Sequence, residues 1–251
     1  MIVVVTGATS GFGASTARRF ASSGHRVVAV GRRKQRLQTL VAELGEERVH
    51  PVVLDVRDRP AVEAAFASLP ADYAQVDVLV NNAGLALGLE PAHETSIEQW
   101  EEMVDTNVKG LMYMTRVLLP AMVARRRGHV INIGSVAATY PYPGGNVYCG
   151  TKAFVRQFSL SLRADLRHTH VRVSCVEPGL VGGSEFSLVR FGGDAERAAR
   201  LYEGADPLTP EDVAEAVYWV AGLPARVNVN TLELMPVSQS FGPLPVDRAG
   251  Q

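Results

Sequence analysis

The sequence predicts an α/β fold with a single doubly wound, parallel sheet and helices on both of its faces. Short, β-branched apolar runs alternate with helical patterns along the whole chain, and a glycine-rich turn follows the first run. Alternation of this kind is typical of parallel βαβ units with right-handed crossovers. The 251 residues, 47% of them hydrophobic, can bury one sizeable core, so we expect one domain over 1–251.

The first half of the chain supplies the first four strands and three of the helices. Gly24 and Gly45 are expected to end the first two helices, because glycine is common just past a helix end. Pro60 suits the first turn of the third helix. The expected strands are 2–5, 27–30, 49–54 and 76–80, and the expected helices are 12–23, 34–44 and 60–69.

The second half begins with a long helical pattern over 96–126. Ser96 is expected to cap it, and Pro120 should bend or interrupt it. The glycine-rich and charged segment 182–204 is predicted to be a mobile lid over the substrate. The tail after residue 235 should be extended, because it carries Pro236, Pro243 and Pro245. The remaining expected strands are 130–133, 171–176 and 231–235, and the remaining helices are 148–166 and 210–221.

Charge and composition argue against several classes of partner. The net charge of −1 implies no broad basic face, so nucleic acid and anionic membranes are poor candidates. No run approaches the roughly 20 apolar residues of a membrane helix, and no basic leader is evident, so we expect a cytoplasmic protein. Cys149 and Cys175 are expected to be reduced thiols, and the six scattered histidines suggest no metal site.

The glycine-rich turn lies between the first strand and the first helix, where a dinucleotide would bind. Glycines there allow a tight turn and let backbone amides approach a pyrophosphate at the helix N-terminus. Such a cluster alone is a weak signal, and a plain structural turn is the alternative, but the strand–turn–helix context favours a cofactor. The residues expected to contact it are Gly7, Thr9, Ser10, Gly11, Phe12 and Gly13.

The end of the second strand indicates which cofactor binds. An acidic residue there would hold the ribose 2′-hydroxyl of NAD, whereas arginine suits the 2′-phosphate of NADP. This chain has Gly31-Arg32-Arg33 with no carboxylate nearby. A guanidinium can hold a phosphate through two hydrogen bonds, so we predict NADP(H), with solvated surface arginines as the alternative.

Tyr148 and Lys152 are the candidate catalytic pair. They are four residues apart on an expected helix, so their side chains share one face. A tyrosine has a pKa of about 10, and a nearby ammonium favours the phenolate. Ser135, at the end of the fifth strand, can donate a hydrogen bond to the reacting oxygen of a substrate. The set predicts hydride transfer to or from a nicotinamide, with Tyr148 exchanging the proton.

Together these motifs resemble the short-chain dehydrogenase/reductase family over essentially the whole chain. The resemblance implies that Asn107 holds a water that links Lys152 to solvent. It also implies that Asp55 contacts the adenine and that the next residue, Val56, lies at the cofactor too. The Asn-Asn-Ala-Gly segment would border the adenosine. The further cofactor residues that it implies are Asn82, Ala83, Gly84, Tyr148, Lys152, Pro178, Gly179, Val181 and Ser184.

Three segments, 81–88, 142–148 and 177–186, resemble the branch of the family that oxidises 3-hydroxy acids. That resemblance implies serine, L-allo-threonine or the 3-hydroxypropionate/malonic semialdehyde pair as substrates, and a homotetramer. Ser184 replaces an expected threonine, and Cys149 replaces an expected small residue and should fill a packing role. Arg190 is the candidate anchor for a substrate carboxylate, although a solvated surface arginine is at least as good an interpretation.

Two other functions stay open at this point. One is an NADPH-dependent reductase of a different ketone, such as a 3-oxoacyl thioester or a cyclic ketone. The other is a nicotinamide-sensing regulator without catalysis. Regulators of that kind typically lose the tyrosine or the lysine, and this chain keeps both Tyr148 and Lys152.

Overall fold

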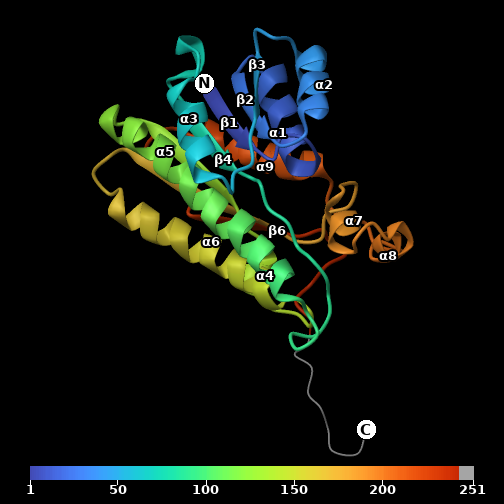
Figure 1. Ribbon diagram of the computed structural model, residues 1–251. Coiled ribbons are helices and arrows are strands. Elements are labelled where there is room, and N and C mark those ends of the chain that lie inside the picture. The colour runs from blue at the N-terminus through green and yellow to red at the C-terminus, as the bar shows by residue number, and fades with distance from the viewer. Residues whose placement is uncertain (243–251) are drawn as a thin grey trace, which may run out of the picture.

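The computed structural model describes residues 1–242 and contains a seven-stranded parallel sheet (Figure 1). The strand order is β3-β2-β1-β4-β5-β6-β7. The order reverses between β1 and β4, and ligands bind beyond the carboxyl ends of the strands at such a reversal. The predicted doubly wound sheet is therefore confirmed. Its strands are β1 (Ile2–Thr6), β2 (Arg26–Gly31), β3 (Val49–Val53), β4 (Val78–Asn81), β5 (Gly128–Ile133), β6 (Val171–Pro178) and β7 (Thr231–Leu234).

Helices cover both faces of the sheet (Figure 1). On one face α1, α2 and α9 enclose one buried apolar cluster, and on the other face α3, α5 and α6 enclose a second. The helices on the two faces are α1 (Gly11–Ser22), α2 (Lys34–Leu44), α3 (Arg59–Ala67), α4 (Ile97–Val104), α5 (Leu111–Ala124), α6 (Asn146–Asp165) and α9 (Pro210–Gly222).

The predicted helix ends follow from local chemistry. Gly24, which follows the C-cap of α1, and Gly45, the C-cap of α2, adopt φ angles of +83° and +94°, which an L side chain would resist. The side chain of Ser96 accepts a hydrogen bond from the backbone of Gln99 at the start of α4. Residues 235–242 form no helix or strand, and Pro243 and Pro245 lie outside the described residues.

The prediction of an interruption at Pro120 is wrong. Pro120 lies inside α5, which continues through it to Ala124. The buried side chains of Leu118 and Met122 hold this part of α5 against the core, so one missing backbone hydrogen bond does not end the helix. The irregularity lies earlier, where a π-helix, η2 (Asp105–Gly110), joins α4 to α5.

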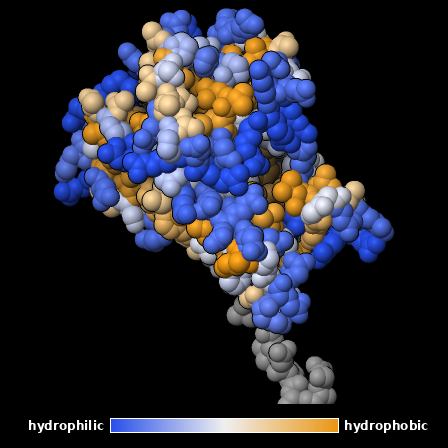
Figure 2. Space-filling view, in the orientation of Figure 1, coloured by the Kyte–Doolittle hydropathy of each residue, from blue (hydrophilic) through white to orange (hydrophobic). Residues whose placement is uncertain are grey.

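The segment 182–204 forms a lobe at the edge of the molecule rather than an irregular loop. It contains two short helices, α7 (Phe186–Arg190) and α8 (Ala195–Arg200). At its base Gly182 donates a backbone hydrogen bond to Leu208, which fixes the lobe to the following segment. In Figure 2 the lobe presents hydrophobic residues beside the body of the molecule. Its mobility stays a prediction.

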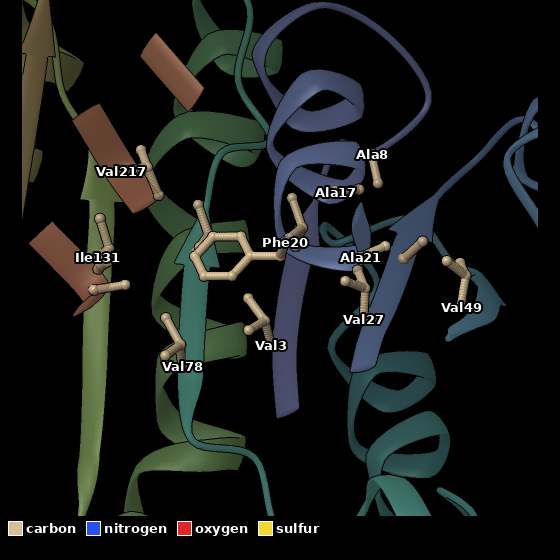
Figure 3. Packing of buried hydrophobic residues seen from close by; sticks show 14 of the residues in the cluster. Val3, Ala8, Ala17, Phe20, Ala21, Val27, Val49, Val78, Ile131 and Val217 are labelled. Atoms are coloured by element: carbon tan, nitrogen blue, oxygen red, sulfur yellow. The ribbon is translucent and has the colours of Figure 1, made fainter. Parts of the chain in front are cut away.

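Phe20 shows how the first face of the sheet is filled (Figure 3). Its ring is fully buried in the cluster beneath α1, with Val3, Val78 and Val217 in the same cluster. Parallel strands covered on both faces need near-continuous apolar runs, which explains the valine-rich strands. This rigid layer fixes the strand ends from which the functional side chains project.

Glu177 is a buried carboxylate near the end of β6. It is fully buried, and the groups that most offset its burial are the Arg156 guanidinium, 3.7 Å away, and the neighbouring Cys175 thiol. Burial raises the pKa of Glu177 above its usual range, against the opposing effect of the Arg156 charge. At a pH just above the usual pKa of glutamate, the folded state therefore keeps a proton that the unfolded chain releases. As the pH rises through this range, Glu177 lowers the free energy of unfolding.

We expect Glu177→Gln to remove that dependence. Between pH 5 and pH 8 the free energy of unfolding should fall more steeply in the unmodified protein than in the variant, because only the buried carboxyl group can lose a proton there. Urea unfolding at the two pH values measures this difference. Glu63→Gln, at an exposed position on α3, is the control. If the free energy of unfolding changed with pH equally in Glu177→Gln and in the unmodified protein, Glu177 would not be the source of this pH dependence.

Candidate active site

The glycine-rich turn and the Asn-Asn-Ala-Gly segment interlock at the point where the strand order reverses. A Cβ atom on Gly13 would lie 2.3 Å from the carbonyl oxygen of Gly7, and one on Gly7 would lie 2.8 Å from Nδ2 of Asn82. The Thr6 hydroxyl accepts hydrogen bonds from the backbone amides of Asn82 and Ala83, both at 2.9 Å. Only glycine allows this approach, so the turn holds one fixed shape beneath the N-terminus of α1.

A cleft of about 590 Å³ opens above the carboxyl ends of the strands. Ligand sites commonly fall between 300 and 1,000 Å³. Among the predicted site residues, Gly13 and Asn107 are set back from the cleft wall. All the others line it, namely Gly7, Thr9, Ser10, Gly11, Phe12, Arg32, Arg33, Asp55, Val56, Asn82, Ala83, Gly84, Ser135, Tyr148, Lys152, Pro178, Gly179, Val181, Ser184 and Arg190.

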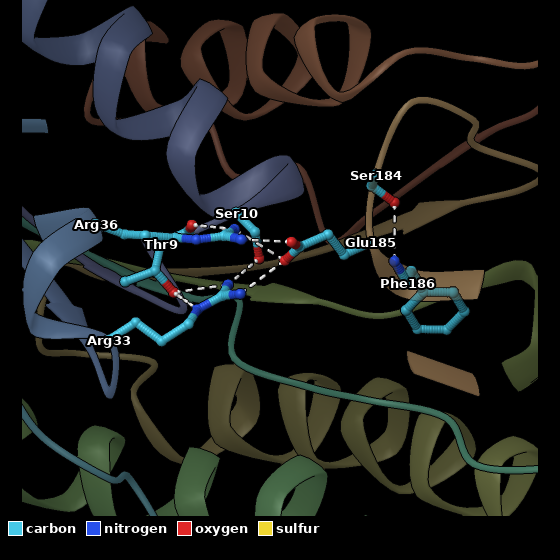
Figure 4. A network of polar contacts seen from close by, with 7 residues as sticks. All are labelled: Thr9, Ser10, Arg33, Arg36, Ser184, Glu185 and Phe186. Atoms are coloured by element: carbon cyan, nitrogen blue, oxygen red, sulfur yellow. Dashed lines mark hydrogen bonds and ion pairs between the residues drawn. The ribbon is translucent and has the colours of Figure 1, made fainter. Parts of the chain in front are cut away.

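One end of the cleft carries a cluster of arginines around a single carboxylate (Figure 4). Arg33 donates hydrogen bonds to the hydroxyls of Thr9 and Ser10, the latter at 2.8 Å, and to Glu185 at 2.7 Å. Arg36 donates to the same carboxylate at 2.6 Å. Hydrogen bonds from Arg36 and Arg33 lower the pKa of Glu185 to about 2, so it stays charged.

Arg36 and Glu185 were not among the predicted site residues. The three-residue spacing of Arg33 and Arg36 on one helix face was a signal for the first of them. No pattern among the residues near Glu185 indicates that it pairs with Arg36 on α2, about 150 positions earlier.

Asp55 forms an ion pair within its own loop. Three nitrogen atoms of Arg57, including its backbone amide, donate to the Asp55 carboxylate at 2.7–3.0 Å. Burial acts to raise the pKa of Asp55, but the hydrogen bonds from Arg57 outweigh it and hold that pKa below its usual range. Arg32 lies 3.9 Å from the same carboxylate, with 60% of its side chain exposed. The predicted contact between Asp55 and an adenine stays a prediction.

The structure brings Ser135, Tyr148 and Lys152 together at the other end of the cleft. Nζ of Lys152 lies 5.8 Å from the centre of the Tyr148 ring, so the two side chains share one face of α6 as predicted. The same ammonium donates a hydrogen bond to the carbonyl of Ile133 at 2.9 Å. The Ser135 hydroxyl accepts from Ala137 at 3.1 Å and contacts the Pro178 carbonyl at 3.4 Å.

The predicted effect of Lys152 on the phenol needs correction. Burial raises the pKa of Tyr148 above its usual range, and the hydrogen bond with Ser135 and the charge of Arg190 oppose that rise without reversing it. Burial likewise lowers the pKa of Lys152 to about 8. Burial of the phenol has the largest effect on its pKa, and the Lys152 ammonium directs its hydrogen bond at Ile133 rather than at the phenol.

Asn107 lies on the π-helix η2, almost fully buried behind the cleft. Its side-chain oxygen accepts from the backbone amide of Leu85 at 2.8 Å, and its side-chain nitrogen donates to the Leu85 carbonyl and to Thr151. The side chain therefore fixes the chain directly after the Asn-Asn-Ala-Gly segment. Its predicted role in holding a relay water stays a prediction.

Arg190, at the end of α7, reaches the catalytic end of the cleft. It donates hydrogen bonds to the carbonyl of Gly88 and the hydroxyl of Tyr142, both at 3.0 Å. Its guanidinium carbon lies 5.7 Å from the centre of the Tyr148 ring. Within residues 1–242 its buried Nη2 has no hydrogen-bond partner. The alternative of a solvated surface arginine is therefore wrong.

The two departures from the family pattern have small structural consequences. Ser184 lines the cleft, and its hydroxyl accepts from the amide of Phe186 at 3.4 Å. Cys149 is a buried free thiol that packs in a cluster with Tyr142 and Tyr148, which agrees with the predicted packing role. Cys175 is also a free, buried thiol.

Comparison with known proteins defines the class. Residues 1–187 match the family described as short chain dehydrogenase. The fold and the arrangement of Ser135, Tyr148 and Lys152 in the cleft agree with that match. The chain belongs to the short-chain dehydrogenase family.

Particular relatives are similar over almost the whole chain. The NADP-dependent 3-hydroxy acid dehydrogenase YdfG of Salmonella typhimurium is 65% identical over 249 residues, which cover 99% of this chain and 100% of the relative. A closed form of serine dehydrogenase complexed with NADP+ is 62% identical with a TM-score of 0.98, covering 99% of this chain and 100% of that one. Serine dehydrogenase from Escherichia coli is 58% identical with a TM-score of 0.86, and the match covers 96% of this chain and 100% of that one.

Two further findings concern residues 1–242 alone. None of their helices combines the length and the apolarity that a bilayer crossing requires. They also contain no group of three or more His, Cys, Asp or Glu side chains arranged to hold a metal ion.

Proposed function

We propose that this chain is an NADP(H)-dependent dehydrogenase that transfers a hydride between the nicotinamide and a small 3-hydroxy acid. Serine, L-allo-threonine and the 3-hydroxypropionate/malonic semialdehyde pair are the proposed substrates. One observation carries the choice of an acid: Nη2 of Arg190 is buried without a partner in the wall of the cleft that also holds Tyr148. A buried cationic donor is costly without an acceptor, and a substrate carboxylate would supply one.

The residues present fit NADP(H). The glycine turn lies at the N-terminus of α1, where a pyrophosphate would bind, and a Cβ atom on Gly7 or Gly13 would collide with the Asn-Asn-Ala-Gly segment or the turn itself and change the shape of that turn. Arg32 and Arg33, with the hydroxyls of Thr9 and Ser10, would hold the 2′-phosphate. The similar NADP-dependent 3-hydroxy acid dehydrogenase and the NADP+ complex of serine dehydrogenase support the same cofactor.

The catalytic side chains divide the chemistry among them. The bound nicotinamide supplies or accepts the hydride. During oxidation Tyr148 takes the proton of the alcohol as a phenolate, and during reduction it gives that proton back as a phenol. Ser135 donates a hydrogen bond to the reacting oxygen, and Arg190 holds the carboxylate so that the hydroxyl faces Tyr148.

The raised pKa of Tyr148 agrees with a phenol that stays protonated as the acid of the reductive direction. Lys152 and the bound cationic nicotinamide would supply the positive charge that oxidation requires.

The fold and the lobe suggest how the site is enclosed. We propose that 1–251 is one domain and that 182–204 acts as the lid over the substrate, because Phe186 packs 5.9 Å from the Tyr148 ring and Arg190 follows it. Closure would exclude water from the path of the hydride.

A cytoplasmic homotetramer is part of the proposal, as the resemblance implies. The exposed Phe154 and Leu160 on α6 are consistent with a contact between copies. A mass from light scattering tests the tetramer.

An NADP-linked absorbance assay tests the proposed function directly. L-serine, L-allo-threonine and 3-hydroxypropionate should reduce NADP+ with kcat/KM values at least tenfold above those for alcohols that lack a carboxylate, because only acids engage Arg190. A 3-oxoacyl thioester and a cyclic ketone, offered with NADPH, represent the alternative reductase. Turnover confined to those ketones would overturn the substrate assignment, and binding of NADPH without any turnover would favour a regulator.

A further inference from the structure

Glu185 joins the two ends of the cleft through a single short helix. It directly precedes α7, and Arg190 is the last residue of that helix. At one end Arg33 and Arg36 hold the Glu185 carboxylate, and at the other end Arg190 bonds to Gly88 and Tyr142. A one-turn helix fixed at both ends transmits the position of one end to the other. Glu185 itself touches neither Tyr148 nor Ser135.

The arginines around Glu185 carry more positive charge than it can balance. Arg33 and Arg36 both pair with this one carboxylate, while Arg57 is bound to Asp55 and to Glu102. Arg32 lies 3.9 Å from Asp55 and is mostly exposed. The four arginines therefore face three carboxylates, and one positive charge remains unmatched beside a cleft that opens to solvent. A phosphate monoester carries about −1.5 to −2 at pH 7, so it would be attracted to this excess.

The geometry favours cooperation between a phosphate and Glu185. Arg33 and Arg36 bond to the same carboxylate, so their guanidiniums are held close together and repel each other. A phosphate held by Arg32 and Arg33 would reduce that repulsion and fix the Arg33 side chain, which also holds Glu185. The proposed coupling requires this ordering of Arg33 to outweigh the repulsion between the phosphate and the Glu185 carboxylate.

We propose that Glu185 is a positioning residue that makes carboxylate binding at Arg190 depend on the 2′-phosphate of the cofactor. This inference rests on the proposed function. The phosphate fastens Glu185 through Arg33 and Arg36, and α7 then holds Arg190 beside Tyr148. The protein then binds the hydroxy acid more tightly when NADP(H) is bound than when NAD(H) is bound, in addition to binding NADP(H) itself more tightly.

Hydrogen–deuterium exchange tests the inference without turnover. In the unmodified protein, saturating 2′,5′-ADP should slow exchange of the α7 amides, and 5′-AMP should slow it much less, because only the first carries the 2′-phosphate. In Glu185→Gln, 2′,5′-ADP should still bind by calorimetry but should lose its additional protection of α7. Glu185→Asp, which keeps the charge, should restore part of it.

Kinetics give a second readout. With the unmodified protein, KM for the hydroxy acid should be about tenfold lower with NADP+ than with NAD+, as typical coupling energies allow. Glu185→Gln should bring the two KM values together while changing kcat much less. Glu43→Gln is a matched control, because Glu43 also accepts three hydrogen bonds from one arginine, Arg18, on the exposed surface. It should behave as the unmodified protein does.

The outcomes separate the two proposals. Equal phosphate-dependent protection of α7 in Glu185→Gln and the unmodified protein would overturn the role of Glu185. Failure of 2′,5′-ADP to bind the unmodified protein would instead overturn the NADP assignment. Phosphate-dependent protection without turnover of any hydroxy acid would support the role of Glu185 and reject the substrate.

Discussion

Tyr148→Phe is expected to lower turnover of the hydroxy acid by about 10³-fold, within the range typical of general acid–base catalysis, while NADPH binds almost as before. The phenol is the group that would exchange the proton of the substrate. Phenylalanine keeps the ring that packs 5.9 Å from Phe186, so the cleft should keep its shape. Steady-state rates measure the loss, and a fluorescence titration measures the retained affinity for NADPH.

Tyr140→Phe is the matched control for that variant. The Tyr140 hydroxyl contacts Glu233 at 3.3 Å and lies on the surface away from the cleft. Its removal should change turnover less than twofold, because no reacting atom is near it. Turnover of Tyr148→Phe within a factor of two of the unmodified protein would reject Tyr148 as the acid and base.

Arg190→Leu is expected to reduce kcat/KM for the hydroxy acid by about 100-fold, mostly through KM. Truncating one partner of a buried, hydrogen-bonded charge pair commonly costs about 2–5 kcal/mol, and about 2.7 kcal/mol corresponds to 100-fold. Leucine retains apolar volume but removes the donors that contact Gly88 and Tyr142 as well as Nη2. Initial rates across a range of substrate concentrations measure the change.

A neutral substrate distinguishes binding of the carboxylate from a purely structural role. For the methyl ester of the same hydroxy acid, Arg190→Leu should lower kcat/KM less than tenfold, because the ester has no negative charge to pair with Arg190. Arg197→Leu, in the same lobe but with half of its side chain exposed, should leave both substrates almost unaffected. Equal losses for the acid and the ester in Arg190→Leu would show that Arg190 only shapes the lobe.

Much of the fold could be predicted from local sequence. The helix over 34–44 has the predicted bounds, because Gly45 ends it with a φ angle that glycine tolerates. The valine-rich strands were evident because strands buried on both faces require continuous apolar runs. The π-helix at 105–110 could not be foreseen, because it adds only one residue per turn to the surrounding helix and no residue type in it marks that change.

The candidate site divides in a similar way. The sequence by itself determined the glycine turn, the cofactor class favoured by Arg32 and Arg33, and the common face of Tyr148 and Lys152. Each depends on neighbours within a few residues, or on the rule that parallel strands present their carboxyl ends at one edge.

Only the tertiary structure decided which charges meet. It placed Arg190 beside Tyr148, joined Glu185 to Arg33 and Arg36, and reversed the expected direction of the shift in the Tyr148 pKa. Electrostatic energies depend on distance through space and on burial, and neither is written in the order of residues along the chain.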